Sequence, residues 1–102
     1  MNTRAKRGHY NGLYEAILSL QSVEECIDFF EDLCTMTELT AMEQRFQVAK
    51  FLHEGKIYNE ILAETGASSA TISRVNRTLQ YGKGGYDLVF SRTEAADGEE
   101  NA

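Results

Sequence analysis

The residue types best suited to chemistry lie close together between Ser68 and Lys83. Small hydroxyl and apolar side chains come first and cations follow: Ser68, Ser69, Ala70, Thr71, Ser73, Arg74, Arg77 and Lys83. Hydroxyl groups can donate or accept hydrogen bonds at base edges, and alanine and threonine methyl groups can contact thymine methyls. Arginine and lysine can neutralise phosphates. The pattern predicts a surface that reads double-stranded DNA. The alternative is that these small polar side chains merely face water.

A short helix, a glycine turn and a second helix are expected to position these side chains. Gly66, in the sequence Thr65-Gly66-Ala67, can adopt the left-handed backbone that a tight turn between helices needs. Ser68 or Ser69 can cap the second helix. Apolar residues at helical spacing mark the two helices, at 57–64 and 70–79: Ile57, Ile61, Leu62, Ile72, Val75 and Leu79. This arrangement is a helix-turn-helix at about residues 57–80, whose second helix enters the major groove N-terminus first.

The rest of the chain also predicts helices. Apolar spacing indicates a helix near residues 13–20, and capping boxes at Ser22–Glu25 and Thr35–Glu38 open two more. The helix after Thr35 ends at Gly55, which is placed as a C-cap. Strand-like alternation is absent from the sequence. We therefore predict an all-α fold.

Composition favours a single domain over residues 11–92. Residues 1–10 form a basic N-terminal arm, which we expect to be partly disordered. Residues 93–102 are acidic and small, and we expect a disordered acidic tail there. Without the two tails roughly 80 residues remain, and a domain of that size buries only about 60–65% of its unfolded surface, so a homodimer that shares a core is expected.

The distribution of charge supports a nucleic-acid partner although the net charge is −6. Residues 65–86 contain Arg74, Arg77 and Lys83 and no acidic residue, whereas residues 13–64 are predominantly acidic. A basic region on an acidic body can attract phosphate locally. The alternative is a chance gap between acidic residues.

Several function classes are not expected. No apolar run reaches the ~18–20 residues of a membrane helix, and no secretory signal begins the sequence, so we expect a cytoplasmic protein without membrane contact. Cys26 and Cys34 are expected to stay reduced there. The serines have no histidine and acid companions, so an enzyme is not expected. His9 and His53 lack ligands at metal spacing, so no metal or other cofactor is expected; His53 instead suits the end of a helix dipole.

The helix-turn-helix resembles a known family. Gly66-Ala67-Ser68-Ser69-Ala70-Thr71-Ile72-Ser73-Arg74 is similar to the Gly-Ala-x-x-Ala-Thr-Ile-Thr-Arg reading segment of the Trp repressor superfamily. Thr35-Met36-Thr37-Glu38-Leu39 and Gln44-Arg45-Phe46-Gln47-Val48 resemble the long central helix of that family. The whole chain is closer still to the YerC/YecD-type Trp-repressor-related proteins.

This resemblance implies a Trp-repressor-like helical bundle and an intertwined homodimer that presents two recognition helices one DNA turn apart. By resemblance, Ser69, Ala70, Thr71 and Ser73 face the groove. Tyr58 and Asn59 fall where the family contacts backbone and base, but neither reproduces the repressor's residue, so a different operator is expected. The link between Gly55 and Gly66 is shorter than in the repressor, which predicts that the reading head, the helix-turn-helix at about residues 57–80, is tilted.

The resemblance also implies a candidate effector site. Arg45 and Arg74 match the two arginines that bracket tryptophan in the repressor, and we group Thr78 with them. A guanidinium pair suits a carboxylate. However, Val75 stands where the repressor has a glycine beside the indole, and Cys34 replaces a larger apolar wall residue. A tryptophan corepressor is therefore not expected, and the alternatives are another small-molecule effector or none.

The sequence thus predicts a DNA-binding transcriptional regulator, a repressor by resemblance, that binds its operator as a homodimer. Two alternatives are a helical dimeric interaction protein and a DNA-binding module without a transcriptional role. Arg74→Ala and Arg77→Ala separate the interaction protein from the other two, because they weaken DNA binding and its salt dependence only if these arginines contact phosphate.

Overall fold

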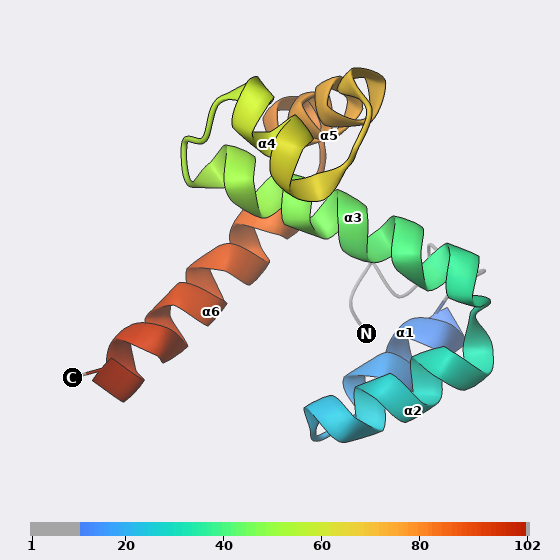
Figure 1. Cartoon of the computed structure of the whole chain (residues 1–102). Helices are drawn as coiled ribbons and strands as arrows, with labels where there is room; N and C mark the ends of the chain where they lie inside the picture. Colours follow the sequence, from blue (N-terminus) through green and yellow to red (C-terminus); the bar gives the residue numbers. More distant parts are fainter. Residues whose placement is uncertain (1–10, 102) are drawn as a thin grey trace. The chain divides into compact units, whose positions relative to one another are not determined.

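The protein's structure is a computed structural model that describes residues 11–101. These residues form six helices and no strand, in the order α1 (Asn11–Leu18), α2 (Val23–Leu33), α3 (Met36–His53), α4 (Tyr58–Thr65), α5 (Ser69–Tyr81) and α6 (Gly85–Asn101) (Figure 1). The all-α prediction is confirmed. The basic arm predicted for residues 1–10 lies outside the described residues. The chain forms two compact units, and the boundary between them falls within α3, after Leu39.

The first unit contains α1, α2 and the first residues of α3, and its helices begin at the predicted caps. Ser22 Oγ accepts from the Glu25 backbone N–H at 3.1 Å, and Glu25 Oε1 accepts from the Gln21 N–H at 2.8 Å. At the start of α3, Thr35 Oγ1 accepts from the Glu38 N–H at 3.1 Å, while Glu38 Oε1 accepts from the Thr35 N–H at 2.8 Å. Both pairs occupy N–H groups at a helix start that have no partner within the helix.

The helices α1 and α2 bury no side chain within this chain. Their apolar residues follow helical spacing, but several remain largely exposed: Tyr14, Leu18, Val23, Ile27 and Leu33, with Met36 at the start of α3. Leu18 keeps 87% of its surface exposed and Val23 keeps 70%. Large apolar side chains that stay exposed close together can mark a surface that another molecule covers.

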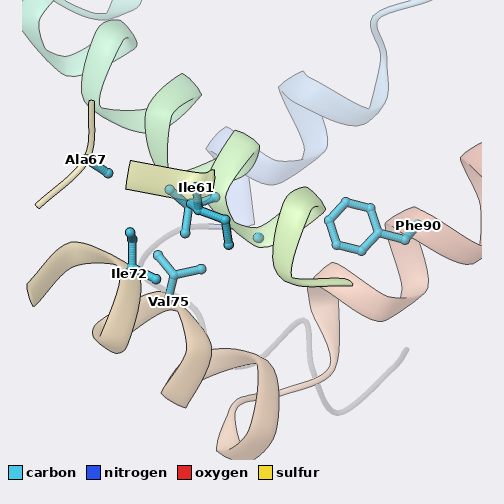
Figure 2. Close-up of a cluster of buried hydrophobic side chains, with 7 residues drawn as sticks. Ile61, Ala67, Ile72, Val75 and Phe90 are labelled. Atoms are coloured by element: carbon cyan, nitrogen blue, oxygen red, sulfur yellow. The ribbon is translucent and has the colours of Figure 1, made fainter. Parts of the chain in front are cut away.

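The second unit holds the buried core. Figure 2 shows Ile61 of α4, Ala67 of the turn, and Ile72 and Val75 of α5 pointing toward one another. Val48 and Ala49 of α3 complete this cluster and are fully buried. The hydrophobic residues needed for a core therefore come from the helix-turn-helix and from the half of α3 that supports it.

The helix α6 joins the second unit through Phe90, which is 2% exposed. The Phe90 ring lies 5.6 Å from the Phe46 ring and stacks on His53 at 4.8 Å between ring centres. His53 Nε2 also lies 2.8 Å from Glu94 Oε1. These contacts tie the end of α3 to α6. His53 lies in the last turn of α3, where it was expected, but its link to Glu94 was not foreseen.

The C-terminal segment departs from expectation. The sequence predicted a disordered acidic tail over residues 93–102, whereas α6 continues to Asn101. Alanine and glutamate are good helix formers, and the segment contains no proline, so the backbone can extend the helix that Phe90 anchors. The side chains from Ser91 to Gly98 are all exposed, which explains why their polar composition resembled that of a tail.

Candidate nucleic-acid interface

The turn between α4 and α5 has the predicted geometry. Gly66 adopts a left-handed conformation with φ +69°, and its N–H donates to the Leu62 carbonyl at 3.0 Å. A residue with a Cβ is strained at this φ, so a glycine suits the position. Ala67 follows and is 3% exposed, so it fixes the turn to the core.

The second helix begins at a serine cap. Ser68 Oγ accepts from the Thr71 N–H at 3.1 Å and lies 3.0 Å from Thr71 Oγ1. Ser68, rather than the alternative Ser69, is therefore the N-cap of α5. The hydroxyl of Thr71 is drawn into this cap, and its side chain is half-buried.

The two sides of α5 differ as the spacing predicted. Ile72 and Val75 are buried, and Leu79 packs against the core. The predicted groove-facing residues Ser69, Ala70 and Ser73 are exposed. The structure thus anchors α5 by its apolar side and leaves small side chains exposed over its first turns, where a base edge can approach closely.

The predicted phosphate-binding residues are also accessible. Arg74 and Arg77 are exposed on α5, and Lys83 is exposed in the loop that follows it. The ion pairs within the described part of the chain, His53–Glu94 and Lys56–Glu64, involve none of these three cations. Tyr58 and Asn59 are exposed at the N-terminal end of α4.

The three candidate effector residues lie together. Arg45 of α3 and Arg74 and Thr78 of α5 line one cavity of about 330 Å³, together with Val75 and Tyr86. Two guanidinium groups in one cavity favour an anion. Tyr86, from the first turn of α6, was not among the predicted site residues. A second, mostly apolar cavity of about 570 Å³ shares Thr78 and Tyr86 with the first and is lined further by Phe46, Leu79 and Val89.

Two polar residues that sequence reasoning missed support the helix-turn-helix. Gln44 Nε2 donates to the Thr65 carbonyl at 3.2 Å and so links α3 to the turn. Lys56 Nζ lies 3.2 Å from Glu64 Oε2 and 4.5 Å from the centre of the Phe51 ring. Lys56 and Glu64 are eight positions apart, beyond the i,i+4 spacing that signals a pair within one helix.

Comparison with known proteins identifies the chain's relatives. Residues 8–94 match the family model described as Trp repressor protein. The chain is 47% identical over 90 residues to YerC of Bacillus subtilis (strain 168), covering 88% of this chain and 86% of YerC. Both findings agree with the resemblance drawn from the reading segment.

Solved structures show the same similarity. A TrpR-like protein from Eubacterium eligens matches with a TM-score of 0.83 and 52% identity, over 91% of this chain and 96% of that one. A protein from Staphylococcus aureus classed with the Trp repressors matches with a TM-score of 0.83 and 45% identity, over 92% of this chain and 95% of that one. The predicted fold class is thereby confirmed. In the described part of the chain, no helix is both long enough and apolar enough to cross a membrane.

Proposed function

Because the chain belongs to the Trp repressor family, we propose that it is a sequence-specific DNA-binding regulator of transcription, which acts as a homodimeric repressor in the cytoplasm. The observation that carries this proposal is the difference in exposure between the two sides of α5. Its small polar side chains and its arginines are exposed, while Ile72 and Val75 hold the opposite side in the core.

In this proposal, α5 recognises the DNA sequence. Ser69 and Ser73 offer hydroxyls that can donate to or accept from base edges, and Ala70 offers a methyl group that suits the thymine methyl. Thr71 offers a methyl group of its own, since its hydroxyl already contacts the Ser68 cap. The helix N-terminus adds a favourable field for a phosphate.

Phosphate binding depends on the cations around this helix. Arg74, Arg77 and Lys83 are free of ion pairs within the described residues, so no carboxylate there has to be displaced before a phosphate binds. Tyr58 and Asn59, at the start of α4, are proposed as further contacts to the DNA backbone or a base. Each cation that meets a phosphate adds about one unit to the salt dependence of binding.

The homodimer is proposed from the exposed apolar side chains of α1 and α2. Leu18, Val23, Ile27 and Leu33 would be covered by a second copy of the chain. Covering a fully exposed side chain of this kind contributes up to about 1.5–3 kcal/mol, and the sum of these contributions has to exceed the entropy lost on association. A two-fold dimer also presents two copies of α5 to two half-sites.

Any small-molecule effector is proposed to bind at Arg45, Arg74 and Thr78. The cavity suits a carboxylate or another anion, but Val75 is buried beside it and takes up space that an indole needs. We therefore do not propose tryptophan as the corepressor. An anion held between Arg45 and Arg74 would link α3 to the recognition helix, and DNA affinity would then respond to it.

The decisive experiment is selection of bound fragments from genomic DNA of the organism that encodes the protein, at near-physiological salt. Recovery of a few sites with two half-sites about one helical turn apart supports the regulator. Recovery of sites outside any promoter region favours a DNA-binding module with another role. Fragments without a shared sequence contradict sequence-specific binding by the free protein and leave two possibilities, a missing effector or the dimeric interaction protein.

Substitution of single arginines tests the interface itself. Arg77→Ala is expected to weaken binding to the recovered sites about tenfold and to lower the salt slope by about one unit. Arg92→Ala is the matched control, because Arg92 is an exposed arginine on α6, outside the helix-turn-helix. Equal effects of the two substitutions would exclude a specific phosphate contact at Arg77.

A further inference from the structure

A single hydrogen bond joins α3 to the turn of the helix-turn-helix among the described residues. Gln44 Nε2 donates to the backbone carbonyl of Thr65 at 3.2 Å, across 21 positions of sequence. Both residues are partly buried. Thr65 is the last residue of α4, so its carbonyl lies among those that find no N–H donor within the helix. Gln44 therefore satisfies a backbone group that ends the first helix of the motif.

The Thr65 side chain carries this link into the turn. Thr65 Oγ1 donates to the Ile61 carbonyl at 2.7 Å and accepts from the Ala67 N–H at 3.1 Å. Thr65 thus bonds backward to α4, forward to the turn, and through its carbonyl to α3. Because Gly66 lies between these bonds in a left-handed conformation, the path of the chain into α5 is defined by a few contacts.

Residues proposed to read DNA follow immediately. Ala67 is buried, Ser68 caps α5, and exposed Ser69 and Ala70 come next. A shift of the turn relative to α3 would therefore displace the first turn of α5, where small side chains must approach base edges. A displacement of about 1 Å is enough to disturb hydrogen bonds whose distances span only a few tenths of an ångström.

We propose that Gln44 is a positioning residue for DNA recognition, which fixes the start of the recognition helix relative to α3. This inference rests on the proposed function. Gln44 does not touch DNA; it acts through the Thr65 carbonyl and the turn. Its contribution is to specific binding, because non-specific phosphate contacts tolerate a small change in the position of the helix N-terminus.

The chain offers a matched control on the same helix. Gln47 Nε2 donates to Glu43 Oε1 at 3.0 Å, so among residues 11–101 its amide bonds only within α3. Gln44→Met and Gln47→Met each replace an amide by an unbranched apolar side chain of similar length. Only the first removes a bond to the turn.

The test compares binding to two DNA probes. One is a set of duplexes that the wild-type protein selects from a random-sequence library, and the other is the unselected library at the same salt concentration. Gln44→Met is expected to weaken binding to the selected duplexes about 3- to 10-fold, the effect of one hydrogen bond. Its binding to the unselected library is expected to match that of the wild type, and Gln47→Met should match it on both probes.

A second substitution gives a readout that loss of stability would not produce. In Gln44→Glu, a carboxylate faces the Thr65 carbonyl near neutral pH and cannot donate, so specific binding falls further than in Gln44→Met. As the pH is lowered toward the range in which glutamate is protonated, the carboxyl can donate again. The loss of affinity for the selected duplexes in Gln44→Glu, relative to the wild type at the same pH, is therefore expected to shrink. The loss of affinity in Gln44→Met is expected to stay constant.

Amide hydrogen exchange of the free protein tests the same bond without DNA. Gln44→Met should speed exchange of the Ala67 amide more than exchange of core amides in α5, whereas Gln47→Met should change neither. If the wild type selects no shared sequence, the proposed function fails and the inferred role of Gln44 in recognition fails with it. If the wild type does select a sequence, and Gln44→Met behaves as Gln47→Met in binding and exchange, the inference alone is overturned.

Discussion

The helices α1 and α2 and the helix-turn-helix α4–α5 are both amphipathic, but they bury their apolar residues differently. In α4, the turn and α5, Ile61, Ala67, Ile72 and Val75 are at most 3% exposed. No residue of α1 or α2 is buried, and Leu18 keeps 87% of its surface exposed. The difference indicates that the helix-turn-helix can be ordered by its own chain, and it fits the proposal that a second copy of the chain covers α1 and α2.

This contrast suits a protein that must present a rigid surface and also find a partner. A reading head needs fixed geometry, because base contacts require hydrogen bonds of defined length and angle. A dimerisation surface needs exposed apolar side chains before assembly, since burial in the dimer supplies the free energy of association. Changes in the two regions should therefore have effects of different kinds.

The largest effect on stability is expected from Ile72→Ala. Ile72 is fully buried among Val48, Ile61 and Val75, so the substitution leaves a cavity in the core. The free energy of unfolding should fall by about 2–5 kcal/mol, measured by urea denaturation. Leu88→Ala is the control, because Leu88 is half exposed on α6 and should cost far less. Equal losses in the free energy of unfolding would contradict the assignment of Ile72 to the core.

The next largest effect is expected on assembly, from Ile27→Asp. Ile27 is 48% exposed in α2 and belongs to the apolar face that we propose a second copy covers. A two-fold interface contains the change twice, so it should weaken dimerisation by about 3 kcal/mol or more. Sedimentation equilibrium measures this directly. Asp28→Asn, at the exposed neighbouring position, should leave the dimer intact. A wild-type protein that sediments as a monomer would contradict the proposed cover.

The elements could be predicted from the sequence because their ends are determined locally. Ser22 with Glu25, Thr35 with Glu38, and Ser68 each act within a few residues of a helix start, and Gly66 acts through its own φ. The exposed side of α5 followed in the same way, from the spacing of Ile72 and Val75. The family was identified from the reading segment, which lies within one continuous stretch.

What the sequence could not provide are contacts between distant positions. Gln44 and Thr65 lie on different elements, and nothing in either residue type indicates the other. The approach of His53 to Glu94 and Phe90 depends on how α6 returns to the end of α3. The helical path of residues 93–101 likewise depends on the anchor at Phe90, whereas their composition alone resembles a tail.

A pair of N-cap substitutions compares α2 with α5 through a smaller change in the free energy of unfolding. Ser22 and Ser68 make the same hydrogen bond, at 3.1 Å, at the starts of α2 and α5. Ser68→Ala should lower the free energy of unfolding by about 0.5–2 kcal/mol, because α5 is part of the core. Ser22→Ala should cost as much only if α2 is packed in the assembled protein. Urea denaturation of both variants at high protein concentration measures the difference, and a negligible cost at Ser22 would indicate that α2 frays independently of folding.

The smallest effect is expected from the pH dependence of the cap of α3. The Thr35 backbone N–H, and after it the Thr35 side chain, hold the pKa of Glu38 below its ordinary value of 4.5. A carboxyl with a lowered pKa in the folded state contributes stability above its unfolded pKa and loses that contribution as the pH falls through the folded value. Glu38→Gln should therefore lower stability near neutral pH by a small amount and flatten its fall in acid.

The Glu38 carboxyl is fully accessible to solvent, so salt should weaken this contribution. Thermal unfolding at several pH values and two salt concentrations measures it, with Glu24→Gln as a control that changes the net charge equally without touching Thr35. If Glu38→Gln and Glu24→Gln give the same dependence of stability on pH, the hydrogen bonds of the cap do not stabilise the charged carboxylate of Glu38. The start of α3 would then depend on the Thr35 hydroxyl alone, as α5 depends on Ser68.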